Sequence, residues 1–250
     1  MKQLIAVLSF VLVSLMAYSQ SPEYRDLRIL YADANYEKLV SQAEKYTLKE
    51  KYKKDIPPYF WLAKGLYKLS ISGTDDPEYK NAYKGAIKYL AKGLKYDLKY
   101  NDGAMALEES EFIADFQMTV YETVFNEIVG GSFKRGSGWA IKYIKLTDNI
   151  AGAKYMLGAC KYNDGDKTTA RDYWKQAEVM LSEIESIENW SDADKLMLKM
   201  GVLYSAQALK KSRQADKART LVGKVSQWYE DDPDWQQDYD DIVNAPEEKK

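Results

Sequence analysis

The sequence predicts an all-α protein built from antiparallel helical hairpins, and three observations lead to this prediction. Apolar residues recur every three or four positions over residues 150–162, as they do along one face of a helix. Residues 163–166, Asn-Asp-Gly-Asp, then favour a tight turn. A second periodic stretch covers residues 167–188, and a short turn makes the two helices antiparallel neighbours. Similar but weaker hairpins flank this one.

Within this central hairpin, small and large residues alternate as two closely packed helices require. Gly158 and Ala170 permit close approach, and Trp174 supplies the bulk that fills the space between the helices. Asp166 is placed to cap the second helix, because its side chain can accept a hydrogen bond from a free backbone amide.

Before the central hairpin, the sequence predicts three further helix pairs. The first covers residues 22–48 and turns at 34–36, and the second covers 58–94 with a long loop near 72–77. The third has one long helix over 104–129, then a glycine-rich run over 130–138 that we expect to be a solvated hinge, and a helix over 139–146.

After the central hairpin, residues 191–226 predict the last pair. Ser191 and Asp194 have the spacing of a capping pair ahead of an apolar helix. Trp235, Tyr239 and Ile242 then predict a short final helix whose outer side is acidic or amide, as the end of a helical stack requires.

The central hairpin resembles a tetratricopeptide repeat (TPR) in the order of its key residues: Leu157-Gly158, Tyr162, Ala170, Trp174 and Ala177. The resemblance implies a TPR-like right-handed α-solenoid of about five helical hairpins over residues 20–244. It is specific only in the 150–190 unit, and the units are longer than the roughly 34 residues of a standard repeat. An ordinary helical bundle is the alternative.

The two ends of the chain carry separate predictions. Residues 1–19 carry a lysine at position 2, continue with a short apolar run and end in small residues, which is the pattern of a cleavable signal peptide. The mature protein is then expected to be periplasmic or secreted and not to span a membrane; a retained membrane anchor is the alternative. Residues 245–250 are expected to be a disordered tail.

The composition argues against most catalytic chemistry. The chain has no histidine and one cysteine, Cys160, so we expect no catalytic site, no metal site and no cofactor. Its 36 Lys and Arg stand against 38 Asp and Glu, a balance that does not favour nucleic acid. A hydrolase that uses carboxylates such as Glu108, Glu109 and Glu111 stays open as a minor alternative.

The resemblance implies that the first helix of each pair lines a concave surface, where tyrosine suits an interface. We therefore expect a helical scaffold that binds a protein or peptide partner there, an envelope component in an assembly or secretion complex. A glycan-binding protein with Tyr and Trp platforms is the alternative. The expected partner-binding residues are Tyr24, Arg28, Tyr31, Tyr59, Tyr155, Tyr162, Asn163, Gln207 and Lys210.

Overall fold

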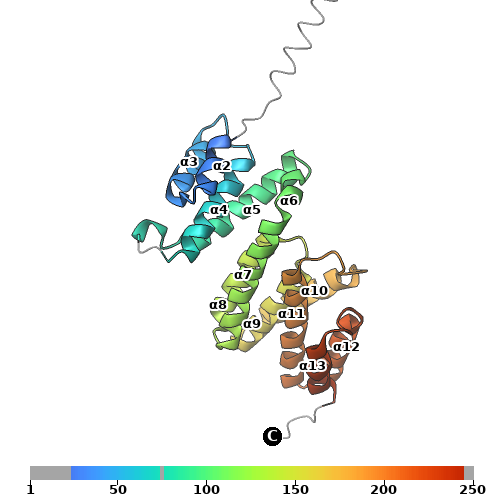
Figure 1. The fold of residues 1–250 in the computed structure, drawn as a ribbon. Helices are drawn as coiled ribbons and strands as arrows, with labels where there is room; N and C mark the ends of the chain where they lie inside the picture. Colours follow the sequence, from blue (N-terminus) through green and yellow to red (C-terminus); the bar gives the residue numbers. More distant parts are fainter. Residues whose placement is uncertain (1–23, 74–75, 245–250) are drawn as a thin grey trace, which may run out of the picture. The chain divides into compact units, whose positions relative to one another are not determined.

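The computed structural model describes residues 24–73 and 76–244, and this part of the chain is all helical (Figure 1). It contains twelve α-helices and three short 3-10 helices, and no strand. The prediction of an all-α protein is therefore confirmed. The chain divides into two compact units, residues 1–108 and 109–250, and each is described by itself. That one array runs through both units stays a prediction.

Unit 1 consists of two hairpins and a short helix. Its helices are α2 (Arg25–Ala32), α3 (Tyr36–Leu48), α4 (Pro57–Ile71), the 3-10 helix η1 (Pro77–Tyr79), α5 (Ala82–Tyr100) and α6 (Ala104–Glu108). Helix α4 packs against α2, α3 and α5, so it forms the centre of the unit. A Cβ at Gly65 of α4 would lie 2.9 Å from Val40 of α3, which shows how closely these two helices approach.

Unit 2 contains three hairpins and a terminal helix. Its helices are α7 (Ser110–Val129), α8 (Phe133–Tyr143), η2 (Ile144–Leu146), α9 (Ala151–Asn163), α10 (Lys167–Ser182), α11 (Asp192–Lys211), α12 (Ala215–Val225), η3 (Ser226–Trp228) and α13 (Pro233–Val243). The final helix buries Trp235 and Ile242, whereas Asp234 and Asp241 are exposed and Asp238 and Asp240 are partly exposed.

The central hairpin is confirmed as α9 and α10. Gly165, with a φ of 91°, makes the turn, and the Asp166 carboxylate accepts a hydrogen bond from the Thr169 amide at 3.1 Å. Hydrogen bonding from the Thr169 side chain, and then from its amide, lowers the pKa of the Asp166 carboxyl group. A Cβ at Gly158 would lie 2.2 Å from Nε1 of Trp174, so only glycine leaves room for the indole ring.

Four helices of unit 2 contact one another in a ring: α7 packs on α8, α8 on α9, α9 on α11, and α11 on α7. We call them the four-helix ring. Helices α9 and α11 are in backbone contact, because a Cβ at Gly201 would lie 2.3 Å from the Gly152 carbonyl oxygen. In a regular solenoid a hairpin contacts only its nearest neighbours. The contact between α7 and α11 departs from that pattern, and a solenoid arrangement is not confirmed.

The polar centre of the ring is Asp194 of α11, which is 3% exposed. Its carboxylate accepts hydrogen bonds from the Tyr143 hydroxyl at 2.6 Å, the Thr147 hydroxyl at 2.9 Å and the Asn149 amide at 3.0 Å. The amide of Asp194 also donates to the Ser191 hydroxyl, so the predicted cap is present. Asp194 therefore takes part in the cap of α11 and also connects α8, and the loop after it, to that helix.

Three predicted elements are wrong in detail. Residues 130–138 are not a hinge, because α8 begins at Phe133 and Gly136 packs against Ile128, 2.8 Å from where its Cβ would lie. The helix predicted over 104–129 breaks at Glu109, between α6 and α7. Helix α10 ends at Ser182 rather than near residue 188, and the following turn buries Ile187 in the core of unit 2.

The predicted signal peptide, residues 1–19, and the predicted tail, residues 245–250, lie outside the described residues. Among the helices that are described, none is both long enough and apolar enough to cross a membrane.

Candidate functional site

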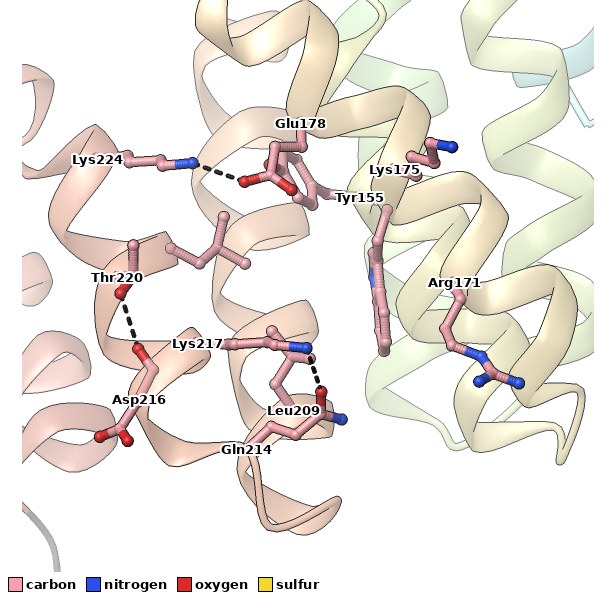
Figure 2. A pocket seen from close by; sticks show the side chains of 12 residues that line it. Tyr155, Arg171, Lys175, Glu178, Leu209, Gln214, Asp216, Lys217, Thr220 and Lys224 are labelled. Atoms are coloured by element: carbon pink, nitrogen blue, oxygen red, sulfur yellow. Dashed lines mark hydrogen bonds and ion pairs between the residues drawn. The ribbon is translucent and has the colours of Figure 1, made fainter.

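Two adjoining hollows lie in unit 2. The first lies between α10 and α12, the second helices of their hairpins, and the second lies between the end of α9, the start of α10 and the turn that joins α11 to α12. Their volumes are about 380 and 360 Å³, and they share Arg171, Trp174 and Gln214. We call the two together the second-helix groove. Helix α10 forms one wall and α12 the other, and the end of α11 with its following turn closes the lower part (Figure 2).

The floor of the groove is apolar and held in place from below. It consists of Tyr155, Trp174, Leu209 and Leu221. The Trp174 indole donates a hydrogen bond to the Ser205 hydroxyl at 2.8 Å, and that hydroxyl donates to the Tyr155 carbonyl at 2.9 Å. These two consecutive hydrogen bonds, together with the space left by Gly158, fix the indole ring over α9. Trp174 is half-buried and borders both hollows, so the groove offers a rigid aromatic surface.

The walls of the groove are mainly basic. The acidic residues are Glu178 and Asp216 alone, and each has a cationic partner: Lys224 Nζ lies 2.7 Å from the Glu178 carboxylate, and Arg219 lies 3.3 Å from that of Asp216. The basic lining residues are Lys167, Arg171, Lys175, Lys211, Arg213, Lys217 and Lys224.

Figure 2 shows how these charges are placed. Lys217 and Lys224 extend from α12 toward α10, while Arg171 and Lys175 stand on the α10 side. The Lys224–Glu178 ion pair spans the two walls at one end. Lys217 donates to the neutral Gln214 side chain at 2.9 Å, so this contact leaves the lysine charge uncompensated.

Two of the nine predicted partner-binding residues line the groove. Tyr155 is 2% exposed and contributes to the floor. Tyr162 borders the second hollow, where its ring lies 6.0 Å from that of Trp174 and the Lys167 ammonium lies 5.5 Å from its centre.

The other predicted residues of unit 2 lie outside the groove. The Asn163 side chain donates to the Ala159 carbonyl at 2.9 Å, and Lys210 donates to the Asp241 carbonyl at 2.9 Å. Gln207 is exposed on α11. None of the three borders either hollow.

The predicted residues of unit 1 fall into two groups. Tyr24 and Tyr59 are buried and fasten the loop between α3 and α4: Tyr24 donates to the Asp55 carboxylate, and Tyr59 donates to the Lys53 carbonyl at 2.7 Å. As placed, neither ring is available to a partner. Arg28 is exposed and Tyr31 is half-buried beside Trp61, with ring centres 5.4 Å apart.

The basic walls were missed by the sequence analysis, although a signal existed. Lys167, Arg171 and Lys175 follow at four-residue spacing, and Lys217 and Lys224 at seven, so each set lies on one helical face. The resemblance directed attention to first helices, whereas these faces belong to second helices. What the sequence could not show is that the two faces meet across Trp174.

The described residues contain no group of three His, Cys, Asp or Glu side chains able to hold a metal ion. Cys160 is 1% exposed, and burial raises the pKa of its thiol to about 12. The groove combines mainly basic walls with an apolar floor. No family model and no curated protein matches this chain, so its function is argued from this geometry.

Proposed function

We propose that this chain is a TPR-like helical scaffold, secreted or periplasmic, that binds a protein or peptide partner from the cell envelope. The TPR-like assignment is supported by the central hairpin, in which Gly158 and Trp174 pack in close contact. The location is supported by the signal-peptide pattern of residues 1–19. The function is that of a binding module and not of an enzyme.

The second-helix groove is the observation that supports this function most. Ligand-binding sites combine an apolar floor with a few polar groups that fix orientation, and the groove has both around Trp174. Binding in this groove differs from the expected use of a concave surface lined by first helices. Binding in the groove and binding on the concave surface can be distinguished by a variant that fills only the groove.

Crosslinking in living cells followed by immunoprecipitation tests the function. Thr220 is an exposed lining residue of α12, and a Thr220→Trp change places a large ring in the groove without altering charge. The matched control is Thr168→Trp on α10, which is exposed but lines neither hollow. We expect a reproducible envelope protein with the unmodified chain and the control, and its loss with Thr220→Trp. Recovery of the chain alone would contradict the proposal.

Glycan binding by partly exposed Tyr and Trp rings is the alternative function. Lysines already lie over several rings: Lys64 Nζ is 4.7 Å from the centre of Trp61, and Lys142 Nζ is 4.5 Å from that of Trp139. A sugar would have to displace these lysines before it could stack. Titration with cell-wall oligosaccharides tests this alternative, and a Trp61→Ala change would then abolish binding.

A further inference from the structure

We infer that the second-helix groove binds an acidic peptide segment that carries one aromatic or large apolar side chain. The apolar side chain lies on the Trp174 surface, and carboxylates on either side of it meet the basic residues of α10 and α12. This inference rests on the proposed function, because it names the class of partner that the same groove selects.

The charge of the groove carries the first step. The whole chain has a net charge of −2, yet seven basic residues and only two acidic residues line the groove. Both acidic residues are neutralised by their own partners, Lys224 and Arg219. Within the part of the chain that the structure describes, no carboxylate forms an ion pair with Arg171, Lys175 or Lys217. The groove therefore attracts a ligand of negative charge.

The apolar floor indicates what else the ligand must contain, because the basic walls alone would bind any polyanion. Trp174 and Leu209 are half-buried and face the hollow, where a ligand can cover them. Covering apolar area favours a side chain that brings apolar surface of its own. An acidic peptide with an aromatic residue matches both the walls and the floor, whereas a purely charged polymer matches the walls only.

The length of the groove sets the size of the segment. On α10 the lining residues extend from Lys167 to Glu178. Eleven helical steps correspond to about 16 Å, which is the length of about five extended residues. The Lys224–Glu178 ion pair marks one end of this path, and Lys211 and Arg213 border the other.

Fluorescence anisotropy with the full mature chain tests the inference. The probe is a labelled peptide of sequence Glu-Glu-Trp-Glu-Glu, compared with Glu-Glu-Ala-Glu-Glu and Lys-Lys-Trp-Lys-Lys. We expect the first peptide to bind most tightly, the alanine peptide to bind about tenfold more weakly, and the lysine peptide not to bind. Because the attraction is between partly exposed charges, binding of the first peptide should weaken as salt rises.

Charge reversal locates the site. The Lys175→Glu/Lys217→Glu variant changes both walls, and we expect it to weaken binding of the tryptophan peptide by at least about tenfold. The control is Lys134→Glu/Lys145→Glu, which makes the same change in charge at exposed residues away from the groove. Circular dichroism establishes that both variants keep the helical fold.

Several outcomes would overturn the inference. Equal loss in both variants, or equal binding of the three peptides, would show that the groove does not select this chemistry. If heparin or an oligothymidine bound as tightly as the tryptophan peptide, and lost as much affinity in the Lys175→Glu/Lys217→Glu variant, the groove would be a general polyanion site. Binding of no peptide, together with capture of the cellular partner by the Lys175→Glu/Lys217→Glu variant, would refute the acidic segment and leave the proposed function standing. Loss of capture only with Thr220→Trp supports that function independently of charge.

Discussion

Glycine residues inside the helices of unit 2 have two different environments. At Gly201 an added Cβ would meet the Gly152 carbonyl oxygen at 2.3 Å, and at Gly152 it would meet the Leu198 backbone nitrogen at 2.4 Å. Backbone atoms cannot move aside as a flexible side chain does. At Gly223 of α12, by contrast, an added Cβ would meet no atom within 4 Å.

These environments predict opposite effects of alanine. A Gly201→Ala change forces α9 and α11 apart and should lower the free energy of unfolding by about 1–3 kcal/mol. A Gly223→Ala change should raise it by about 0.5–1 kcal/mol, because alanine favours the helix and nothing obstructs it. Urea unfolding of the two variants measures both effects. Equal stability of the two would contradict the close backbone contact.

Cys160 is expected to be chemically inert in the folded chain. Its pKa of about 12, raised by burial, leaves almost no thiolate at neutral pH, and thiolate is the reactive form. We expect no reaction with a thiol reagent at pH 8 within minutes, and complete reaction in denaturing urea. Rapid labelling of the native chain would show that α9 opens readily.

The tyrosines show how far the sequence could be read at the residue scale. Tyr24 and Tyr59 were expected at an interface, because the resemblance places them on first helices, whereas no role was predicted for Tyr143. All three are buried, and each hydroxyl reaches a carboxylate or a carbonyl of a loop or another helix. The sequence does not reveal these acceptors. Asp55 and Asp194 lie 31 and 51 residues from their tyrosines, and the Lys53 carbonyl, although near Tyr59 in sequence, is a backbone group whose direction depends on how the loop folds.

At the scale of single helices, an ion pair with a mostly buried lysine connects α13 to α11. Lys199, whose side chain is 7% exposed, has its ammonium 2.8 Å from the carboxylate of Asp232, the N-cap of α13. Burial is the largest single influence and opposes ionisation of Asp232. The hydrogen bond and charge of Lys199, together with hydrogen bonds from the Asp234 and Trp235 amides, outweigh it, so the pKa of this carboxyl group lies below its usual value.

This ion pair predicts that α13 loosens in acid. A carboxyl group with a depressed pKa in the folded state stabilises the fold above its unfolded pKa of about 4, and the effect is lost as pH falls through the folded value. Asp238, 4.0 Å from the same ammonium, has a raised pKa because of burial, so its protonation offsets part of the loss.

The Asp232→Asn change isolates the contribution of Asp232. We expect it to lower stability by about 1–2 kcal/mol at pH 7 and to have a smaller effect at pH 2, because the unmodified carboxyl group takes up its proton as pH falls. Urea unfolding at both pH values, followed by tryptophan fluorescence, measures the difference. An equal effect of the variant at both pH values would mean that Asp232 acts only as a neutral cap.

Helix positions were largely predictable, and their failures have physical causes. The stop at residues 163–166 is correct, because the positive φ at Gly165 needs a residue that tolerates it. The glycine-rich run at 130–138 was misread because Gly136 serves close helix packing and not chain flexibility. Composition alone does not separate these two uses of glycine.

At the scale of the molecule, the division into two units predicts separate folding. Unit 2 has a buried core of its own, to which α9, α11, α12 and α13 all contribute. We expect residues 109–250, produced alone, to keep a helical circular dichroism spectrum and a cooperative unfolding transition. They should also bind the acidic tryptophan peptide as the full chain does, since the groove belongs to this unit. A disordered fragment would contradict this independence.

The meeting of α7 with α11 has a consequence for how unit 2 opens. An open stack of repeats can unfold from its last repeat inward. Here α7, the first helix of unit 2, packs against α11, so neither helix can open without losing this contact. We therefore expect hydrogen exchange to be slowest, and to occur together, in α7, α8, α9 and α11. The amide protons of α10, α12 and α13 should exchange first. The groove walls belong to this second group, so a bound segment would slow exchange where the fold is otherwise weakest.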